Sequence, residues 1–265
     1  MNLLLQNSTA LVTAATDPFG LEIVNSLVAE GARVIVNGST SASVEAALKR
    51  VRASRPRARV ERLVADLATG EGCLKAIESF PEVDILVNKL ELFDEEAFVA
   101  EADDDPLPLD DPRLECGIRL SRHYMALMRH DNGGRLVFLL IVSHPRRKSE
   151  TDLSRVPTDR QLKIISNLTE LTCCTRVPAN TVIFAPPLIS SDSDGLEGCR
   201  SPVSHHHENQ LLGPERAARL AARTIMLTDA VAALITFLCS PRSSAIQNST
   251  IRINVEADWA QMQPR

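Results

Sequence analysis

The feature that most constrains the fold is a regular alternation of short apolar segments and amphipathic segments along the chain. The apolar segments are rich in Val, Ile and Leu and lie at residues 9–14, 33–37, 59–67, 83–88, 135–142, 181–184 and 251–255. Between them, apolar residues recur every three or four positions, as is typical of helices; Val44, Ala47, Leu48 and Val51 are one such set. Strands that are apolar on both faces are characteristic of parallel sheets covered by helices. The chain is therefore predicted to form a single doubly wound, Rossmann-like α/β domain of seven parallel strands with helices on both faces.

Turn-forming residues predict where the helices begin and end. Asp17 followed by Pro18 is typical of an N-cap and the first helical position, and Gly31 predicts the end of that helix. Further helices are predicted at residues 41–52, 72–80, 114–129, 157–174 and 214–222, with a last one that begins at Thr228. The acidic stretch 90–112 is predicted to be a solvated loop. Residues 190–222 are predicted to be a largely irregular, lid-like segment.

Composition and charge limit the class of protein. Hydrophobic residues make up 44% of the 265, enough for one substantial core, and the net charge of -5 disfavours a general nucleic-acid binder. The basic run at residues 49–62 has no aromatic residues to stack on bases, so it is interpreted as the solvated end of a helix. The apolar N-terminus is too short for a secretion signal, and no apolar stretch reaches membrane-spanning length. A cytoplasmic protein with reduced cysteines and no membrane partner is expected.

Several motifs along the chain occur in an order known from one group of proteins. Residues 13–20 read Thr-Ala-Ala-Thr-Asp-Pro-Phe-Gly and resemble Thr-Gly-x-x-x-Gly-x-Gly at a strand-to-helix turn. Residues 86–91 read Leu-Val-Asn-Lys-Leu-Glu and resemble Leu-Val-Asn-Asn-Ala-Gly. With residues 237–253 as the last helix and strand, nearly the whole chain resembles the short-chain dehydrogenase/reductase (SDR) family of NAD(P)-dependent oxidoreductases. The resemblance implies a dinucleotide site at Thr13, Asp17, Phe19, Gly20, Asp66, Leu67 and Asn88.

Two substitutions in the first turn are expected to weaken the implied cofactor site. Ala14 stands where the family's first glycine permits a tight turn, and Pro18 stands where the middle glycine lets the backbone approach the pyrophosphate. Pro18 suits the start of a helix but adds a ring and removes an N–H donor. The second strand ends at Asn37, with no acidic residue nearby, which favours NADP over NAD. NADP or NAD is therefore the implied cofactor, with binding weakened by Ala14 and Pro18.

The family's catalytic residues are the largest departure. The chain contains no Tyr-x-x-x-Lys, because its one tyrosine is Tyr124 and the residue four positions on is Met128. The family's asparagine, serine, tyrosine and lysine positions are held here by Arg113, Ile141, Ser154 and Thr158. Hydride transfer to a carbonyl needs a proton donor, and a positioned acid contributes roughly 10²–10⁴ in rate. A serine hydroxyl is far too weak an acid for this role, so the comparison predicts a homologue that has lost the family's catalysis.

Other polar clusters are alternative candidates for chemistry, and each also has a plainer interpretation. His144 and the cations at 146–148 could supply a substitute acid or an anion site, or could form a basic surface loop. The three histidines at 205–207 are adjacent and rarely converge on one ion, and the acids between 103 and 111 lack a ligand-loop spacing. No metal site is therefore predicted. Cys173 and Cys174 are interpreted as packing residues rather than nucleophiles.

Three hypotheses about function remain open. In the first, the chain is a catalytically inactive homologue that acts through dinucleotide binding or through assembly as a homo-oligomer, a dimer or tetramer. Its pairing helices would be those predicted at 114–129 and 157–174, with Leu120, Leu127, Leu162 and Ile165 at the interface. In the second, the chain is an active NAD(P)-dependent oxidoreductase with another proton donor, such as His144, and an unidentified small-molecule substrate. In the third, the sequence has decayed and has no evolved function.

Overall fold

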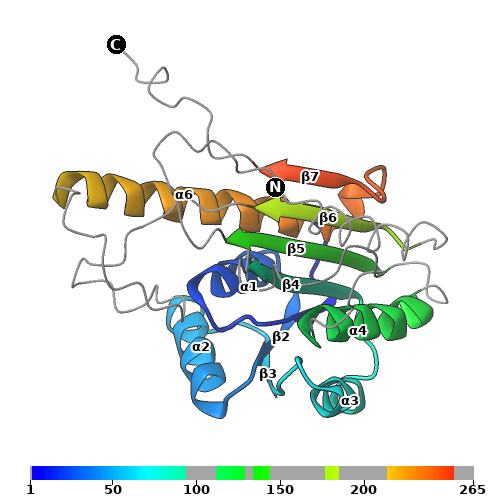
Figure 1. Ribbon diagram of the computed structural model, residues 1–265. Coiled ribbons are helices and arrows are strands. Elements are labelled where there is room, and N and C mark those ends of the chain that lie inside the picture. The colour runs from blue at the N-terminus through cyan, green and yellow to red at the C-terminus, as the bar shows by residue number, and fades with distance from the viewer. Residues whose placement is uncertain (1, 94–111, 129–133, 144–176, 185–213, 254–265) are drawn as a thin grey trace, which may run out of the picture.

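In the computed structural model drawn in Figure 1, seven strands form one sheet in the order β3-β2-β1-β4-β5-β6-β7, and all neighbouring strands are parallel. The structure describes residues 2–93, 112–128, 134–143, 177–184 and 214–253. The strands are β1 (Thr9–Val12), β2 (Arg33–Gly38), β3 (Val60–Val64), β4 (Ile85–Phe93), β5 (Arg135–Ser143), β6 (Ala179–Phe184) and β7 (Thr250–Ile253). The predicted α/β fold with a seven-stranded parallel sheet is therefore confirmed.

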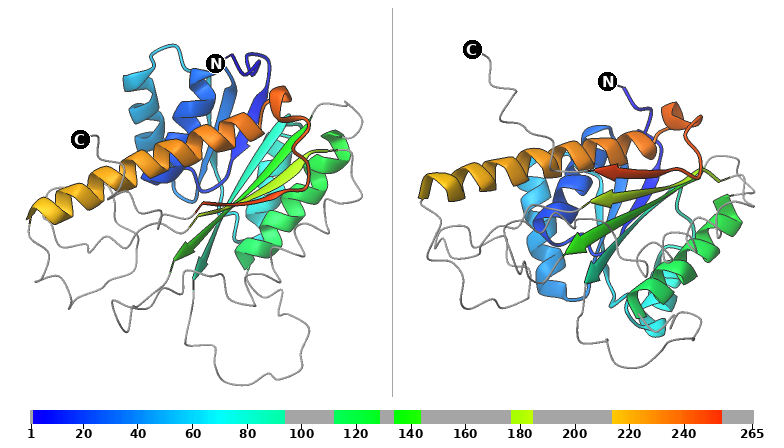
Figure 2. Two further views of the ribbon diagram at one scale, coloured as in Figure 1. Left: turned by 90° about the horizontal axis from the view of Figure 1, so that it is seen from above. Right: turned by 45° about the horizontal axis from the view of Figure 1, so that its top comes forward.

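Helices cover both faces of the sheet, as predicted. They are α1 (Pro18–Ala29), α2 (Ser41–Ser54), α3 (Gly70–Ser79), α4 (Pro112–Met128) and α6 (Pro214–Leu238). Residues of α1, α2 and α6 share one buried cluster, and residues of α3 and α4 share the cluster on the opposite face (Figure 2). The chain fills the positions of β2 and β3 on one side of β1 and then crosses to β4 on its other side. The boundary between β1 and β4 is thus the topological switch point of a doubly wound sheet.

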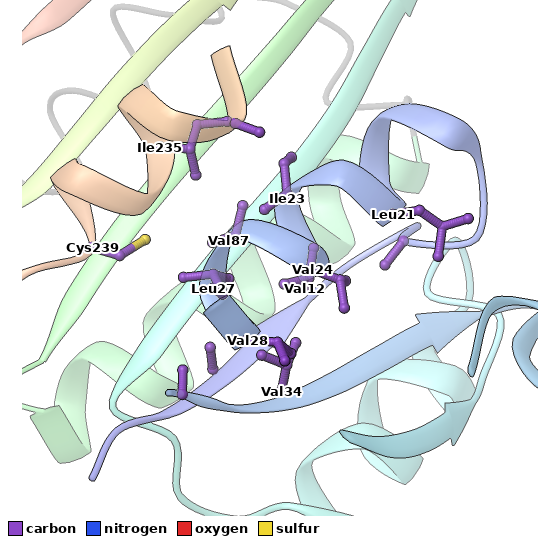
Figure 3. Close-up of a cluster of buried hydrophobic side chains, with 14 of the residues drawn as sticks. Val12, Leu21, Ile23, Val24, Leu27, Val28, Val34, Val87, Ile235 and Cys239 are labelled. Atoms are coloured by element: carbon purple, nitrogen blue, oxygen red, sulfur yellow. The ribbon is translucent and has the colours of Figure 1, made fainter. Parts of the chain in front are cut away.

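Packing fixes the position of α1, the helix that follows β1. Its residues Ile23, Val24 and Leu27 have no solvent exposure, and they form the stripe predicted from the sequence. Figure 3 shows Val24 beside Val12 of β1, and Ile23 and Leu27 on the side of α1 that faces Val87 of β4 and Ile235 of α6. Burying one side chain of this size stabilises a fold by roughly 1.5–3 kcal/mol. The helix is therefore held firmly, with its N-terminus at the carboxyl edge of the sheet.

The predicted start and end signals agree with the structure for α1 and α2. Asp17 is the N-cap of α1, Pro18 lies in its first turn, and Gly31 follows its end with a φ of 88°. The buried residues of α2 are the four predicted ones: Val44, Ala47, Leu48 and Val51. All seven cations of the run at 49–62 are exposed, as expected for the solvated end of a helix.

Two predicted boundaries are wrong. The strand predicted to end at Asn88 continues to Phe93, because β5 is long enough to pair with it, with Leu90 opposite Leu140. The acidic loop was expected to begin at Leu90, which is instead a buried strand residue. The two helices predicted at 214–222 and from Thr228 are one continuous helix, α6. Residues 215–238 contain no glycine or proline that would end it, so residues 214–222 are helical rather than irregular.

One predicted interface residue is also wrong, and several predictions concern residues that the structure does not describe. Leu120 is 1% exposed and packs with α3 and the sheet inside the chain, so it cannot contact a second copy.

Predictions for 94–111, 144–176 and 185–213, including Ser154 and Thr158, lie outside the described residues. Within the described part, no helix could span a membrane. The same part contains no cluster of three or more His, Cys, Asp or Glu suited to a metal ion.

Candidate functional site

The carboxyl ends of β1 and β4 lie side by side at the switch point, where doubly wound sheets bind their ligands. Val12 pairs with Val87, so the turn at residues 13–20 begins level with Asn88 and Lys89. The fold thereby brings together Thr13, Asp17, Phe19, Gly20 and Asn88, five of the predicted cofactor residues. This turn and the adjoining part of β4 form the candidate site.

Thr13 and Asn88 join β1, β4 and α4 through a buried network. The Thr13 hydroxyl donates to Asn88 Oδ1 (3.2 Å) and accepts from the backbone N–H of Lys89 (2.9 Å). The Asn88 amide donates to the carbonyl oxygen of Gly117 (2.9 Å) and to the Ser121 hydroxyl (3.4 Å). Both side chains are almost fully buried. Their observed contacts hold the site together rather than face a ligand.

Ala14 keeps the backbone shape of a glycine turn although it is not glycine. Its φ is 46°, in the left-handed region that disfavours side chains. The Ala14 N–H donates to Asn37 Oδ1 (3.1 Å), and the Ala15 N–H donates to the Asn37 carbonyl oxygen (2.8 Å). The Asn37 amide in turn donates to the carbonyl oxygens of Leu63 (3.3 Å) and Ala65 (3.0 Å). Asn37 therefore ties the turn to β2 and β3, a structural role that sequence reasoning missed.

The carboxylate of Asp17 is held from two sides at the start of α1. Asp17 Oδ1 accepts from the Gly20 N–H at 2.6 Å, which is the side-chain bond of an N-cap. Asp17 Oδ2 lies 2.5 Å from the ammonium nitrogen of Lys89, which also donates to the Ala14 carbonyl oxygen at 3.5 Å. The Lys89 side chain is only 2% exposed, whereas that of Asp17 is 39% exposed. A buried cation from β4 and a half-exposed anion thus meet at the N-terminus of α1.

Gly20 allows α1 to pack closely on the turn that precedes it. A Cβ atom at this position would lie 2.6 Å from Ala15 Cα and 2.9 Å from the Ala15 carbonyl carbon. Because both neighbours are backbone atoms, neither could move aside without shifting the turn. Gly20 therefore permits close packing of α1 on the turn, and the role in helix-on-sheet packing that the resemblance implies stays a prediction.

Phe19 lies against an apolar edge formed by β5 and β6. Its ring packs on that of Phe184, with ring centroids 5.2 Å apart and an angle of 36° between the planes. Phe184 has no solvent exposure and pairs across the sheet with Ile141, which is 7% exposed. Ile141, which the resemblance predicts at the family's serine position, is therefore part of the hydrophobic core. Arg113, at the asparagine position, lies in the first turn of α4.

Asp66 and Leu67, the remaining predicted cofactor residues, form the turn between β3 and α3. Asp66 Oδ1 accepts from the Ala68 N–H (3.0 Å), and its carbonyl oxygen accepts from the Thr69 hydroxyl (2.8 Å). Leu67 packs against the cluster under α3 and α4, and its carbonyl oxygen accepts from Cys73 Sγ at 3.8 Å. The Asp66 carboxylate is exposed on this turn. None of these contacts joins the turn to Asp17 or Lys89.

The chain's one tyrosine is a core residue on the opposite face of the sheet from α1. Tyr124 has no solvent exposure, and its hydroxyl donates to the Phe80 carbonyl oxygen at 2.8 Å. Burial raises the pKa of Tyr124 to about 12, with a smaller contribution from the nearby Cys73 thiol. A tyrosine that gives a proton to a substrate needs a pKa closer to neutrality and contact with the site. Tyr124 has neither property.

Lys89 is a site residue that sequence reasoning missed, although its position inside an apolar strand is unusual for a lysine. Residues 85–90 are otherwise apolar except for Asn88, and a lysine inside such a strand must find a partner if it is buried. Lys89 replaces the second asparagine of the motif that the chain resembles. Sequence alone did not show that its ammonium would reach Asp17, because the contact depends on the register of β1 and β4.

The observed turn does not fit a dinucleotide pyrophosphate. Such a group binds to the N–H donors at the start of the first helix, and its negative charge is stabilised there by the helix dipole. Here Pro18 has no N–H, and the Gly20 N–H already donates to Asp17. A phosphate at this point would also meet the negative charge of that carboxylate. The Asp17 carboxylate, which the resemblance implies as part of the cofactor site, therefore opposes a phosphate at this point.

Comparison with known proteins agrees with the observed fold. Residues 8–143 match the short chain dehydrogenase family. The chain is 31% identical over 255 residues to the uncharacterized oxidoreductase YvaG of Bacillus subtilis (strain 168), an alignment that covers 95% of this chain and 96% of YvaG.

Solved structures share the fold along the whole chain. L-sorbose reductase from Gluconobacter frateurii, determined with NADPH and L-sorbose, superposes with a TM-score of 0.60 at 16% identity, covering 96% of this chain and 97% of the reductase. The hydroxysteroid dehydrogenase from Escherichia coli gives a TM-score of 0.58 at 17% identity, covering 95% and 97%. At such low identity, the likeness concerns the fold alone.

Proposed function

Because the chain belongs to the short chain dehydrogenase family, we propose that it is a homologue of the family's oxidoreductases that has lost their tyrosine-dependent hydride transfer. One observation carries this proposal: the only tyrosine of the chain is built into the core, with its hydroxyl bonded to Phe80. Any proton donor that replaces the family's tyrosine in this chain must therefore be a residue of another type. Ile141 adds support, because it offers no hydroxyl at the serine position.

The chemistry explains why the loss matters. Reduction of a carbonyl transfers a hydride to carbon and a proton to the developing alkoxide oxygen, and an oxidation reverses both transfers. NAD(P)H supplies the hydride in the family's reaction, whereas the protein must hold the proton donor next to the carbonyl oxygen. Losing such a donor lowers the rate by roughly 10²–10⁴. A buried phenol with a pKa of about 12 does not supply this proton.

We propose that the function of the chain is protein assembly, as a homo-oligomer in the cytoplasm. The Asp17 carboxylate at the start of α1 opposes the other candidate role, dinucleotide binding. Of the two predicted interface residues within the described part, Leu127 on α4 is partly exposed and is available for a contact, whereas Leu120 is not. Analytical ultracentrifugation tests the assembly: a dimer or tetramer is expected, and a strictly monomeric protein at all concentrations would contradict it.

Oxidation of NADPH and NADH in the presence of a panel of aldehydes and ketones tests the loss of catalysis. We expect no oxidation beyond the protein-free rate, while an active short-chain reductase in the same buffer consumes cofactor. Saturable, protein-dependent oxidation of either cofactor would overturn the proposal.

The alternative function is an active oxidoreductase with a different proton donor, and the name of its relative YvaG, an oxidoreductase, favours it. His144 follows β5 and is the candidate that the sequence offers. If the cofactor assay shows turnover, its loss in His144→Ala would assign the donor. Turnover that survives in His144→Ala would exclude this residue.

A further inference from the structure

We propose that the Asp17 carboxylate, paired with Lys89, occupies the phosphate position of the dinucleotide fold and competes with a dinucleotide for it. The inference concerns binding rather than catalysis, so it stands whether or not the chain transfers hydride. It rests on the contacts of Asp17 and Lys89, on the burial of Lys89 and on the place of both residues in the fold.

The first step is the position of the carboxylate. The N-terminus of a helix carries a partial positive charge and unsatisfied N–H donors, which together attract anions. In doubly wound folds this terminus receives the pyrophosphate of a dinucleotide. In this chain Asp17 Oδ1 accepts from the Gly20 N–H at 2.6 Å. An anion of the chain itself thus already interacts with the terminus that would receive a phosphate.

The second step is the buried partner of that anion. The Lys89 ammonium comes from β4, lies 2.5 Å from Asp17 Oδ2 and is 2% exposed. A buried ammonium is costly unless an opposite charge or several acceptors surround it. Lys89 therefore favours the conformation in which the Asp17 carboxylate stays at the start of α1. The pair holds the carboxylate in place better than the N-cap bond alone.

The Lys89–Asp17 pair differs in burial from the other two ion pairs between described residues. Arg33 with Glu61, and Arg62 with Glu45, have side chains between 41% and 62% exposed. Exposed pairs of this kind are worth little and exchange readily with water. Of these three pairs, only the one at α1 joins a buried cation to a carboxylate that still reaches solvent. A ligand could approach from that open side but would have to displace Asp17.

Binding of NADPH to Asp17→Gly tests the proposal, measured by isothermal titration calorimetry without any carbonyl substrate. Glycine is tolerated at an N-cap, removes the negative charge and releases the Gly20 N–H. The proposal predicts that Asp17→Gly binds NADPH at least about tenfold more tightly than the wild-type chain. Asp17→Asn keeps an N-cap acceptor but removes the charge, so a smaller gain is expected. Arg33→Gln, which breaks an exposed pair at the other end of the sheet, should leave the affinity unchanged.

Two outcomes would overturn the proposal. Equal or weaker NADPH binding by a folded Asp17→Gly variant would show that the carboxylate is not the obstacle and would point to Pro18 or Ala14. Tight binding by the wild-type chain that Lys89→Asn abolishes would make Lys89 a phosphate ligand instead. If Asp17→Gly alone does not fold because Lys89 loses its partner, Asp17→Gly with Lys89→Asn replaces it and must show the same gain over the wild type. Because no carbonyl is present, either result leaves the proposed loss of hydride transfer untouched.

Discussion

At the scale of single residues, Ala14 combines a retained turn shape with an unsuitable side chain. Its φ of 46° costs an alanine roughly 1–2 kcal/mol, whereas glycine adopts it freely. Part of the gain from Ala14→Gly is lost because glycine also makes the unfolded chain more flexible. We therefore expect Ala14→Gly to stabilise the protein by about 1 kcal/mol and to raise the melting temperature by about 2–4 °C. A lower melting temperature in a calorimetric scan would contradict the observed turn.

Tyr124 gives a second prediction at this scale, because it alone produces the phenolate absorbance of the chain. Burial raises its pKa to about 12 in the folded protein, against an ordinary value of about 10. Below pH 10 the phenol is protonated in the folded and the unfolded chain, so its contribution to stability is complete. Between pH 10 and 12 only the unfolded chain loses the proton, and stability falls by about 1.4 kcal/mol per pH unit. Tyr124→Phe should remove this part of the slope.

A spectrophotometric titration at alkaline pH measures the pKa of Tyr124, and denaturant unfolding at each pH measures the free energy of unfolding. Cys239 contributes to the same range, because burial raises its pKa to about 12, so the comparison with Tyr124→Phe isolates the tyrosine. A phenolate that forms near pH 10 while the protein is still folded would place Tyr124 in contact with water.

The sequence could predict the role of a site residue where that role involves only neighbours in the sequence. The N-cap at Asp17 is confirmed, and both this cap and the contacts of Gly20 with the turn involve neighbours a few residues away. The roles of Lys89 and Asn37 depend on contacts between strands far apart in the sequence. Periodicity does not encode such contacts, so they emerged only from the structure.

At the scale of elements, the junction between β1 and α1 depends on Gly20. In Gly20→Ala the new Cβ would lie 2.6 Å from Ala15 Cα, and overpacking against backbone costs about 1–3 kcal/mol. Gly70→Ala in α3 is the matched control, because its Cβ would approach only the end of the Arg119 side chain, at 2.8 Å from Nη1. We expect denaturant unfolding to show a clear loss of stability for Gly20→Ala and a change within about 0.5 kcal/mol for Gly70→Ala. Equal effects of the two substitutions would argue against close packing at Gly20.

Element boundaries were predictable where turn chemistry marks them. α1 and α2 have side-chain caps from Asp17 and Thr40, and their predicted starts agree with the structure. The end of β4 has no such mark, because the length of the neighbouring β5 decides it. In α6, Thr228 has the side chain of an N-cap residue but lies inside the helix, because no helix-breaking residue stands between Pro214 and Thr228. A capping residue indicates a helix start only when the preceding residues cannot be helical themselves.

At the scale of the whole molecule, the chain has the family's architecture, and our proposal concerns only the ligand edge of the sheet. The sheet order, the helices on both faces and the buried clusters are those of a dinucleotide-binding fold. At the carboxyl edge, an ion pair between Lys89 and Asp17 lies at the start of α1, and Ile141 is buried in the core. The fold depends on many apolar contacts spread along the chain, whereas the family's chemistry depends on a few side chains. The fold can therefore persist after the chemistry is lost.

The most direct test of this account is deuteride transfer from NADPH labelled at C4 to a panel of aldehydes and ketones. Mass spectrometry of the alcohol products detects a transfer even when turnover is very slow. The wild-type chain and the Asp17→Gly variant are compared at millimolar NADPH, so that weak cofactor binding cannot hide the chemistry. The account predicts no protein-dependent deuterium in any alcohol, including with Asp17→Gly. Deuterium above the protein-free level in either sample would contradict it and would show that the chain transfers hydride without a tyrosine in the site.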